Sequence, residues 1–236
     1  MQLFFSKDIQ EKHILFDQDE TRHAAQVLRK KIGDELIVMD GKGGEYFSRV
    51  SRIGKKEMEL DVLRVVTHEK PKVQIHLAVA PTKNMDRVEW LLEKGIEIGL
   101  SSVHFVRCSR SERKQVNLER LEKIALAACK QSITWHFPEL HDIQSFENFL
   151  TQADSQHGAK WMAVCEDAEF TLQTNTIIEE HMWILIGPEG DFTPEEYQAA
   201  RAKGWKGVSL GDKRLRTETA ALLAIAELNF VALGRL

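Results

Sequence analysis

The chain has 236 residues, of which 43% are hydrophobic and 29% charged, a composition typical of one large or two small globular domains and unlike that of a disordered protein. Its N-terminus carries only a short apolar patch followed by charges, so we expect no signal peptide or membrane helix and a cytoplasmic protein. Three widely spaced cysteines and scattered histidines favour reduced thiols and argue against disulfide bonds or a metal site.

The net charge of −4 does not by itself indicate nucleic-acid binding. The charge is unevenly distributed, however: residues 71–140 hold 11 basic and 8 acidic side chains. The densest basic run, 107–114, has four cations and one anion. This run suits a loop that contacts phosphates, although on charge alone a solvated surface is the better explanation.

The N-terminal part has the pattern of a small β domain. A short helix is predicted over 18–31, followed by strands over 35–40, 45–53 and 56–66. Glycines in 41–44 permit the positive φ angles of a tight turn. Short strands joined by such turns predict a small antiparallel sheet or barrel, so we expect a first domain over 1–70.

After Pro71 the pattern changes to alternating strands and helices, which predicts a parallel sheet covered on both faces in a second domain, 71–236. The expected strands are 73–80, 102–106, 160–166, 182–187 and 206–211. The expected helices are 85–98, 118–131, 145–154, 194–203 and 217–233.

Two strand ends in the last third stand out, because open α/β sheets bind ligands beyond the carboxyl ends of their strands. The first runs from the strand at 184 through Gly-Pro-Glu-Gly to Thr193, which with Glu196 forms a capping box at a helix start. The second leads from Leu210 and Gly211 through Arg216 into the last helix. That helix is apolar nearly all round, so it must be buried in the domain or against a second subunit.

The sequence lacks the common motifs for binding dinucleotides or phosphates and for nucleophilic hydrolysis. The segment 41–46 lacks the last glycine of a dinucleotide fingerprint, and no phosphate loop or nucleophile elbow occurs. A nucleotide-sized cofactor would therefore be held by backbone loops.

The motifs LIGPEGDFTPEE and LGDKRLRTETAALLAIAEL resemble the two signature loops of the RsmE family, bacterial enzymes that methylate uracil N3 at position 1498 of 16S ribosomal RNA. HAAQVLRKKIGDELIVMDGKGGEY resembles the start of that family's N-terminal PUA-like β-barrel. AVAPTKNMDRVEWLLEKGIEIG, followed by RCSRSER, resembles the start of its methyltransferase domain. The likeness extends over nearly the whole chain.

The resemblance implies an α/β SPOUT fold with a C-terminal trefoil knot, S-adenosylmethionine as the cofactor, small-subunit ribosomal RNA as the substrate, and a homodimer. Arg216 would face the methyl group and the target base. Either Glu189 or Glu218 could accept the proton of uracil N3, the sequence ranks neither above the other, and water could serve instead. The expected cofactor-binding residues are Leu185, Ile186, Gly187, Gly190, Leu210, Leu215 and Ala220. The expected RNA-binding residues are Arg29, Lys30, Lys83, Arg87, Arg107 and Arg110.

The chain departs from the family pattern at three places. Asp191 stands where the family's GPEGG loop has its last glycine, an arginine near the N-terminus is missing, and the EQSGR-like stretch reads KQSIT at 130–134. Two alternative functions stay open at this point: a non-catalytic RNA-binding assembly factor, and a ribose 2′-O-methyltransferase of the same superfamily. A purely structural role for Arg216 and Glu218, in ion pairs and helix capping, is the other interpretation of those residues.

Overall fold

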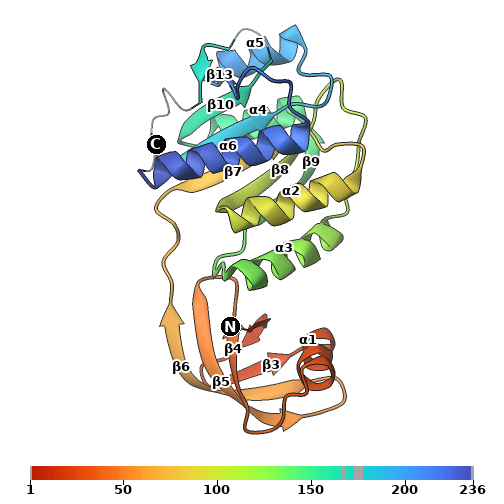
Figure 1. Ribbon diagram of the computed structural model, residues 1–236, viewed down its shortest axis with the longest axis vertical. Coiled ribbons are helices and arrows are strands. Elements are labelled where there is room, and N and C mark those ends of the chain that lie inside the picture. The colour runs from red at the N-terminus through yellow and green to blue at the C-terminus, as the bar shows by residue number, and fades with distance from the viewer. Residues whose placement is uncertain (1, 166–167, 173–177, 235–236) are drawn as a thin grey trace. The chain divides into compact units, whose positions relative to one another are not determined.

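The computed structural model describes residues 2–165, 168–172 and 178–234 (Figure 1). Its contacts divide it into two compact units, Met1–Lys70 with Leu126–Phe137, and Pro71–Ala125 with Pro138–Leu236. The segment Leu126–Phe137 contains the C-terminal half of helix α3 (Leu118–Ser132). Helical periodicity gave no sign that this half groups with the N-terminal unit, because periodicity shows a buried face and not its partner.

The N-terminal unit contains a six-stranded sheet with the order β1-β4-β5-β6-β3-β2. The expected strands are present as β4 (Glu35–Met39), β5 (Gly44–Ile53) and β6 (Met58–Thr67). Three further strands escaped prediction because they are short and flanked by charges: β1 (Leu3–Phe5), β2 (Asp8–Ile9) and β3 (His13–Phe16). Met58 and Leu60 are fully buried and lie on the same face of β6, because side chains alternate between the two faces of a strand.

The helix predicted over 18–31 is shorter than expected. Helix α1 (Gln18–Arg22) begins at Asp17, whose side chain caps it, and continues as a π-helix over His23–Val27. Arg29 then adopts a left-handed conformation with φ of 54°, which ends the helical path. The prediction was therefore wrong for 28–31, and Arg29 and Lys30 lie in the turn that follows the helix.

The second unit is built on a seven-stranded parallel sheet, confirming the predicted class (Figure 1). Its strand order is β11-β13-β10-β12-β7-β8-β9. The strands are β7 (Gln74–Val79), β8 (Leu100–Arg107), β9 (Glu139–Ser145), β10 (Ala159–Ala163), β11 (Phe170–Thr171), β12 (His181–Ile186) and β13 (Lys206–Ser209).

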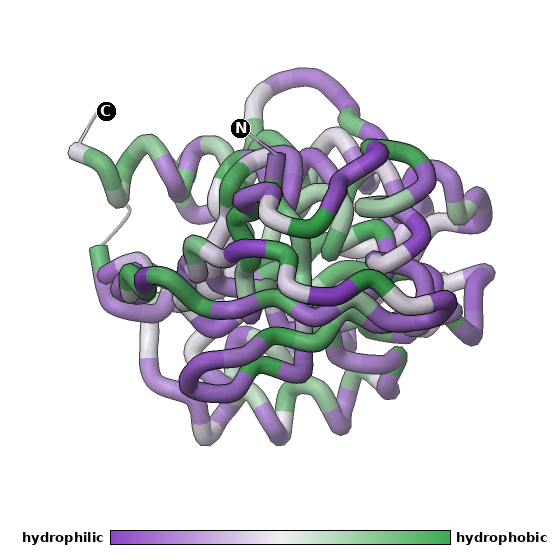
Figure 2. The backbone as a smooth tube through the Cα atoms, turned by 90° about the horizontal axis from the view of Figure 1, so that it is seen from below, coloured by the Kyte–Doolittle hydropathy of each residue, from purple (hydrophilic) through white to green (hydrophobic). Residues whose placement is uncertain are grey.

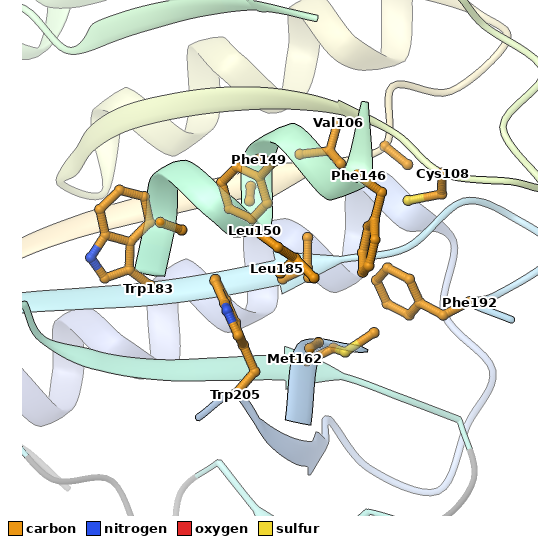
Figure 3. Packing of buried hydrophobic residues seen from close by; sticks show 14 residues of the cluster. Val106, Cys108, Phe146, Phe149, Leu150, Met162, Trp183, Leu185, Phe192 and Trp205 are labelled. Atoms are coloured by element: carbon orange, nitrogen blue, oxygen red, sulfur yellow. The ribbon is translucent and has the colours of Figure 1, made fainter. Parts of the chain in front are cut away.

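Helices cover both faces of this sheet. One face packs against α4 (Phe146–Asp154) and α5 (Pro194–Ala202), forming a core that includes Trp183, Leu185 and Phe149 (Figure 3). The alternate strand residues face α2 (Met85–Glu97) and α6 (Thr217–Ala232), which lie side by side (Figure 1).

The two edge strands β9 and β11 were not predicted. An edge strand pairs on one side only and needs less apolar character, and the β9 sequence ELHDIQS is largely polar. The predicted strand 160–166 ends at Ala163, and its last residue lies outside the described part. No helix among the described residues is long and apolar enough to cross a membrane.

Candidate active site

A cavity of about 1200 Å3 lies at the carboxyl ends of three neighbouring strands, β12, β10 and β13. Its wall consists mainly of chain segments that follow these strands, namely 163–165, 186–194 and 210–217. Helix α5 adds the side chains of Tyr197, Gln198 and Arg201. This is the edge at which open parallel sheets bind ligands, so the topology makes the cavity the candidate site.

The segment after β12 is anchored in the core by Phe192. Its ring is 7% exposed and lies 5.9 Å from that of Phe146 (Figure 3). Gly187 passes close above this ring, because a Cβ added there would lie 2.9 Å from a Phe192 ring carbon. Glycine is therefore required at 187 by packing against Phe192.

A second set of contacts fixes this segment from the side of β8. One Nη of Arg110 donates to the carbonyl oxygens of Gly190 and Phe192, at 2.7 and 3.3 Å. The carboxylate of Glu196 accepts from the Ser109 amide at 2.7 Å and from the Thr193 amide at 2.9 Å. The capping box predicted at the start of α5 is confirmed, and it also holds the basic loop against the site.

The two signature loops are in direct contact. The hydroxyl of Thr217, the first residue of α6, donates to the Gly187 carbonyl at 3.3 Å, and Arg214 donates to the Glu189 carbonyl at the same distance. Gly211 has a φ of 114° and open space where a Cβ would stand. At this position a left-handed backbone conformation is required, which glycine provides without strain.

The expected cofactor residues are brought together with one exception. Six line the cavity: Ile186, Gly187, Gly190, Leu210, Leu215 and Ala220. Leu185 is fully buried and belongs to the core between the sheet and α4. Side chains alternate along a strand, so Leu185 supports the loop from beneath and does not form part of the cavity wall.

Both expected catalytic residues lie on the cavity. Arg216 precedes α6 in an extended conformation and is exposed, and Glu189 is exposed in the facing loop. Glu218 differs from them: it is 7% exposed, is absent from the cavity wall, and pairs with Arg87 at 3.5 Å. The structure thus separates the two candidate proton acceptors that the sequence left unranked.

The expected RNA-binding residues are distributed over both units. Arg110 lines the cavity, while Arg107 is exposed at the end of β8. Lys83 is exposed and pairs with Glu112 at 3.1 Å. Arg29 and Lys30 belong to the N-terminal unit.

Several cavity residues were missed by sequence reasoning. Helix α5 presents Pro194, Tyr197 and Arg201 to the cavity, and their helical spacing was the available signal. The guanidinium of Arg201 lies 5.7 Å from the Tyr197 ring centre. Residues 163–165 also line the site, but nothing in their sequence indicates this.

The cavity fits a nucleotide-sized cofactor. Its wall includes glycines from both strand ends, Gly187, Gly190 and Gly211, together with several charged residues. The basic side chains on its wall outnumber the acidic ones by five to three: Arg110, Arg201, Lys213, Arg214 and Arg216 against Glu189, Asp191 and Asp212. This balance favours an anionic partner such as a polynucleotide at the rim.

A parallel α/β sheet with a nucleotide-sized cavity at its carboxyl edge, in a chain that also contains a separate β unit, is typical of two-unit enzymes that use a nucleotide-derived cofactor. Residues 68–229 match the family model of the RNA methyltransferase domain, and 16–63 match the RNA methyltransferase PUA domain. The chain belongs to this family, in its RsmE branch, as the sequence motifs predicted.

Known proteins resemble this chain over nearly its whole length. A crystal structure of a probable rRNA-methyltransferase from Porphyromonas gingivalis is 34% identical, covers 99% of both chains and has a TM-score of 0.91. A ribosomal RNA small subunit methyltransferase E from Neisseria gonorrhoeae, solved bound to S-adenosyl methionine, is 26% identical, covers 98% of both chains and has a TM-score of 0.84. The protein of the same name from Buchnera aphidicola is 26% identical over 96% of this chain and 91% of its own length.

Proposed function

We propose that this protein methylates N3 of a single uridine, position 1498, in 16S ribosomal RNA of the small subunit, with S-adenosylmethionine as the methyl donor. The observation that carries the proposal is the single cavity formed by both signature loops, with Arg216 and Glu189 on its wall. Family membership and a relative solved with S-adenosyl methionine support the same cofactor and class of substrate.

The two signature loops provide the residues that would hold S-adenosylmethionine in a bent conformation. Backbone at Gly187, Gly190 and Leu210, with the side chains of Leu215 and Ala220, would hold it in the cavity. When bound, S-adenosylmethionine supplies a methyl group on a sulfonium centre, which is already a good leaving group, so the proposal needs no metal.

The side chains at the rim have two tasks, because N3 lies on the pairing edge of uracil and carries a proton in the neutral base. The uridine must be unpaired or flipped, and its proton must leave. Arg216 stabilises the negative charge that develops on the uracil oxygens. Glu189 accepts the proton, and Glu218 is disfavoured by its burial beside Arg87.

RNA binding is assigned to both domains, the PUA-like domain 1–70 and the methyltransferase domain 71–236, and we place the protein in the cytoplasm with the ribosomal subunits. The proposed phosphate contacts are Arg29, Lys30, Lys83, Arg87, Arg107 and Arg110. Such contacts position the RNA without reading its sequence.

The proposal includes a homodimer and a knotted C-terminal segment. Helix α6 buries one side against β7, β12 and α2, yet Phe230 remains 46% exposed and Leu233 54%. Hydrophobic (green) stretches make up much of the helix that leads to the C-terminus (Figure 2). A second copy would cover these side chains. The contacts of Thr217 and Arg214 with the loop after β12 fit a chain that passes through that loop.

The test is transfer of tritiated methyl groups from S-adenosylmethionine to small subunits that lack the modification, followed by digestion to nucleosides and mass analysis. We expect N3-methyluridine as the single labelled product. A non-catalytic assembly factor would bind the subunits without labelling them. A ribose methyltransferase would yield a 2′-O-methylated nucleoside, and either result would overturn the proposal.

A further inference from the structure

Asp191 adopts a backbone conformation that favours glycine. Its φ is 61°, in the left-handed region, and its amide donates to the Pro188 carbonyl at 2.9 Å, closing a tight turn. Asp and Asn tolerate this region better than other side chains, whereas glycine occupies it freely. An aspartate at this position is therefore compatible with the turn but needs a separate physical reason.

That reason is visible in the contacts of the carboxylate. Oδ2 of Asp191 accepts from the backbone amide of Cys165 at 3.3 Å, and Oδ1 accepts from the Phe192 amide at 2.8 Å. Cys165 lies just beyond the end of β10, so the first bond connects two loops that follow neighbouring strands. Both loops line the cavity.

Arg110 fixes the carbonyls on either side of Asp191 from the opposite direction, since it donates to Gly190 and Phe192. The turn is thus held to β8 through Arg110 and to β10 through Asp191. Without the carboxylate, nothing in the described contacts of residue 191 would link the turn to the end of β10.

We infer that Asp191 is a positioning residue for the cofactor: its carboxylate holds the β12 loop against the end of β10 and so presets the cavity for S-adenosylmethionine. The inference rests on the proposed function for the identity of the cofactor. It follows from the general rule that ordering a loop before binding lowers the cost of binding. Both carboxylate oxygens of Asp191 already accept hydrogen bonds from backbone amides, so the side chain acts by shaping the loop. We therefore expect its loss to weaken cofactor affinity and to leave the methyl-transfer step unchanged.

The test uses the full-length protein and three variants, with S-adenosylmethionine affinity measured by calorimetry. Asp191→Gly removes the bond but keeps the turn without strain, so the fold is retained. We expect about a fivefold weaker affinity, the size typical of one lost hydrogen bond. Asp191→Asn keeps one acceptor oxygen, which can serve the Cys165 amide or the Phe192 amide but not both, so its affinity should lie between those of the parent and Asp191→Gly. Glu195→Ala removes a nearby carboxylate outside the cavity wall and should bind like the parent.

Kinetics separate positioning from general structural damage. In Asp191→Gly, KM for S-adenosylmethionine should rise by a similar factor while kcat at saturation and the Tm of the free protein stay near parent values. Equal affinity in the parent and Asp191→Gly overturns the inference. A parent that does not bind S-adenosylmethionine at all contradicts the proposed function instead.

Discussion

Lowering the pH from about 7.5 to about 5 should reduce the free energy of unfolding through two buried histidines of the parallel sheet. His76 on β7 and His104 on β8 are 8% and 7% exposed. His76 bonds Ser102 at 2.7 Å and His181 at 2.9 Å, while His104 bonds Ser102 at 3.2 Å and stacks on His141 at 3.9 Å. These four histidines lie on four adjacent strands, β12, β7, β8 and β9.

Burial, followed by the charges of neighbouring histidines, lowers both pKa values from 6.5, to about 4 for His76 and about 3 for His104. The unfolded chain therefore takes up protons first as the pH falls below about 6.5, and stability is lost progressively until the folded pKa is reached. At about pH 5 linkage gives a loss of about 2 kcal/mol for each histidine, or about 4 kcal/mol together. Coupling between the two makes the sum an upper figure.

The assay is urea unfolding followed by tryptophan fluorescence at several pH values between about 5 and 7.5. His104→Phe keeps an aromatic ring in the stack and should reduce the acid-induced loss by about 2 kcal/mol. His157→Gln replaces an exposed histidine and serves as the matched control. An unchanged pH dependence in His104→Phe would show that protonation of His104 does not cause the acid-induced loss, whatever that variant's stability at neutral pH.

Three further predictions concern the site and the assembly. Gly187→Val should lose S-adenosylmethionine binding in calorimetry, because its Cβ would meet the Phe192 ring at 2.9 Å and displace the loop; unchanged affinity would remove this loop from the site. Arg216→Ala should lower turnover on the order of a hundredfold with nearly intact cofactor affinity and Tm; parallel losses of Tm and affinity would instead indicate a structural arginine. Sedimentation at micromolar concentration should show a dimer that Phe230→Glu weakens, and a stable, active parent monomer would contradict the proposed interface.

The parallel sheet was predictable because its central strands are buried on both faces and are largely apolar, as in the β12 sequence HMWILI. The helices were predictable from periodicity and from caps such as Thr193. Edge strands that are short or polar have neither a long apolar run nor a clear alternation of apolar and polar residues, which explains why β1, β9 and β11 were missed. The early end of the N-terminal helix at Val27 depends on the left-handed Arg29, which no propensity rule indicates.

The site was predictable where glycine marks a strand end. The site was harder to predict where the role of a side chain depends on residues that are close in the fold but distant in the sequence. Arg110 was expected to contact RNA, and the sequence did not indicate that it also donates to two carbonyl oxygens of the loop after β12. Those bonds form because the fold brings the loop after β8 close to the loop after β12. Similarly, Asp191 stands out in the sequence only as a departure from a motif, and its bond to Cys165 joins residues 26 positions apart.

The most direct test of the central claim is a map of modified uridines in 16S ribosomal RNA from cells with and without the gene. If the protein methylates this uridine, one N3-methyluridine, at position 1498, disappears on deletion, returns with the parent gene, and stays nearly absent with Arg216→Ala. An unchanged set of base methylations, or the loss of a ribose methylation in its place, would contradict this function.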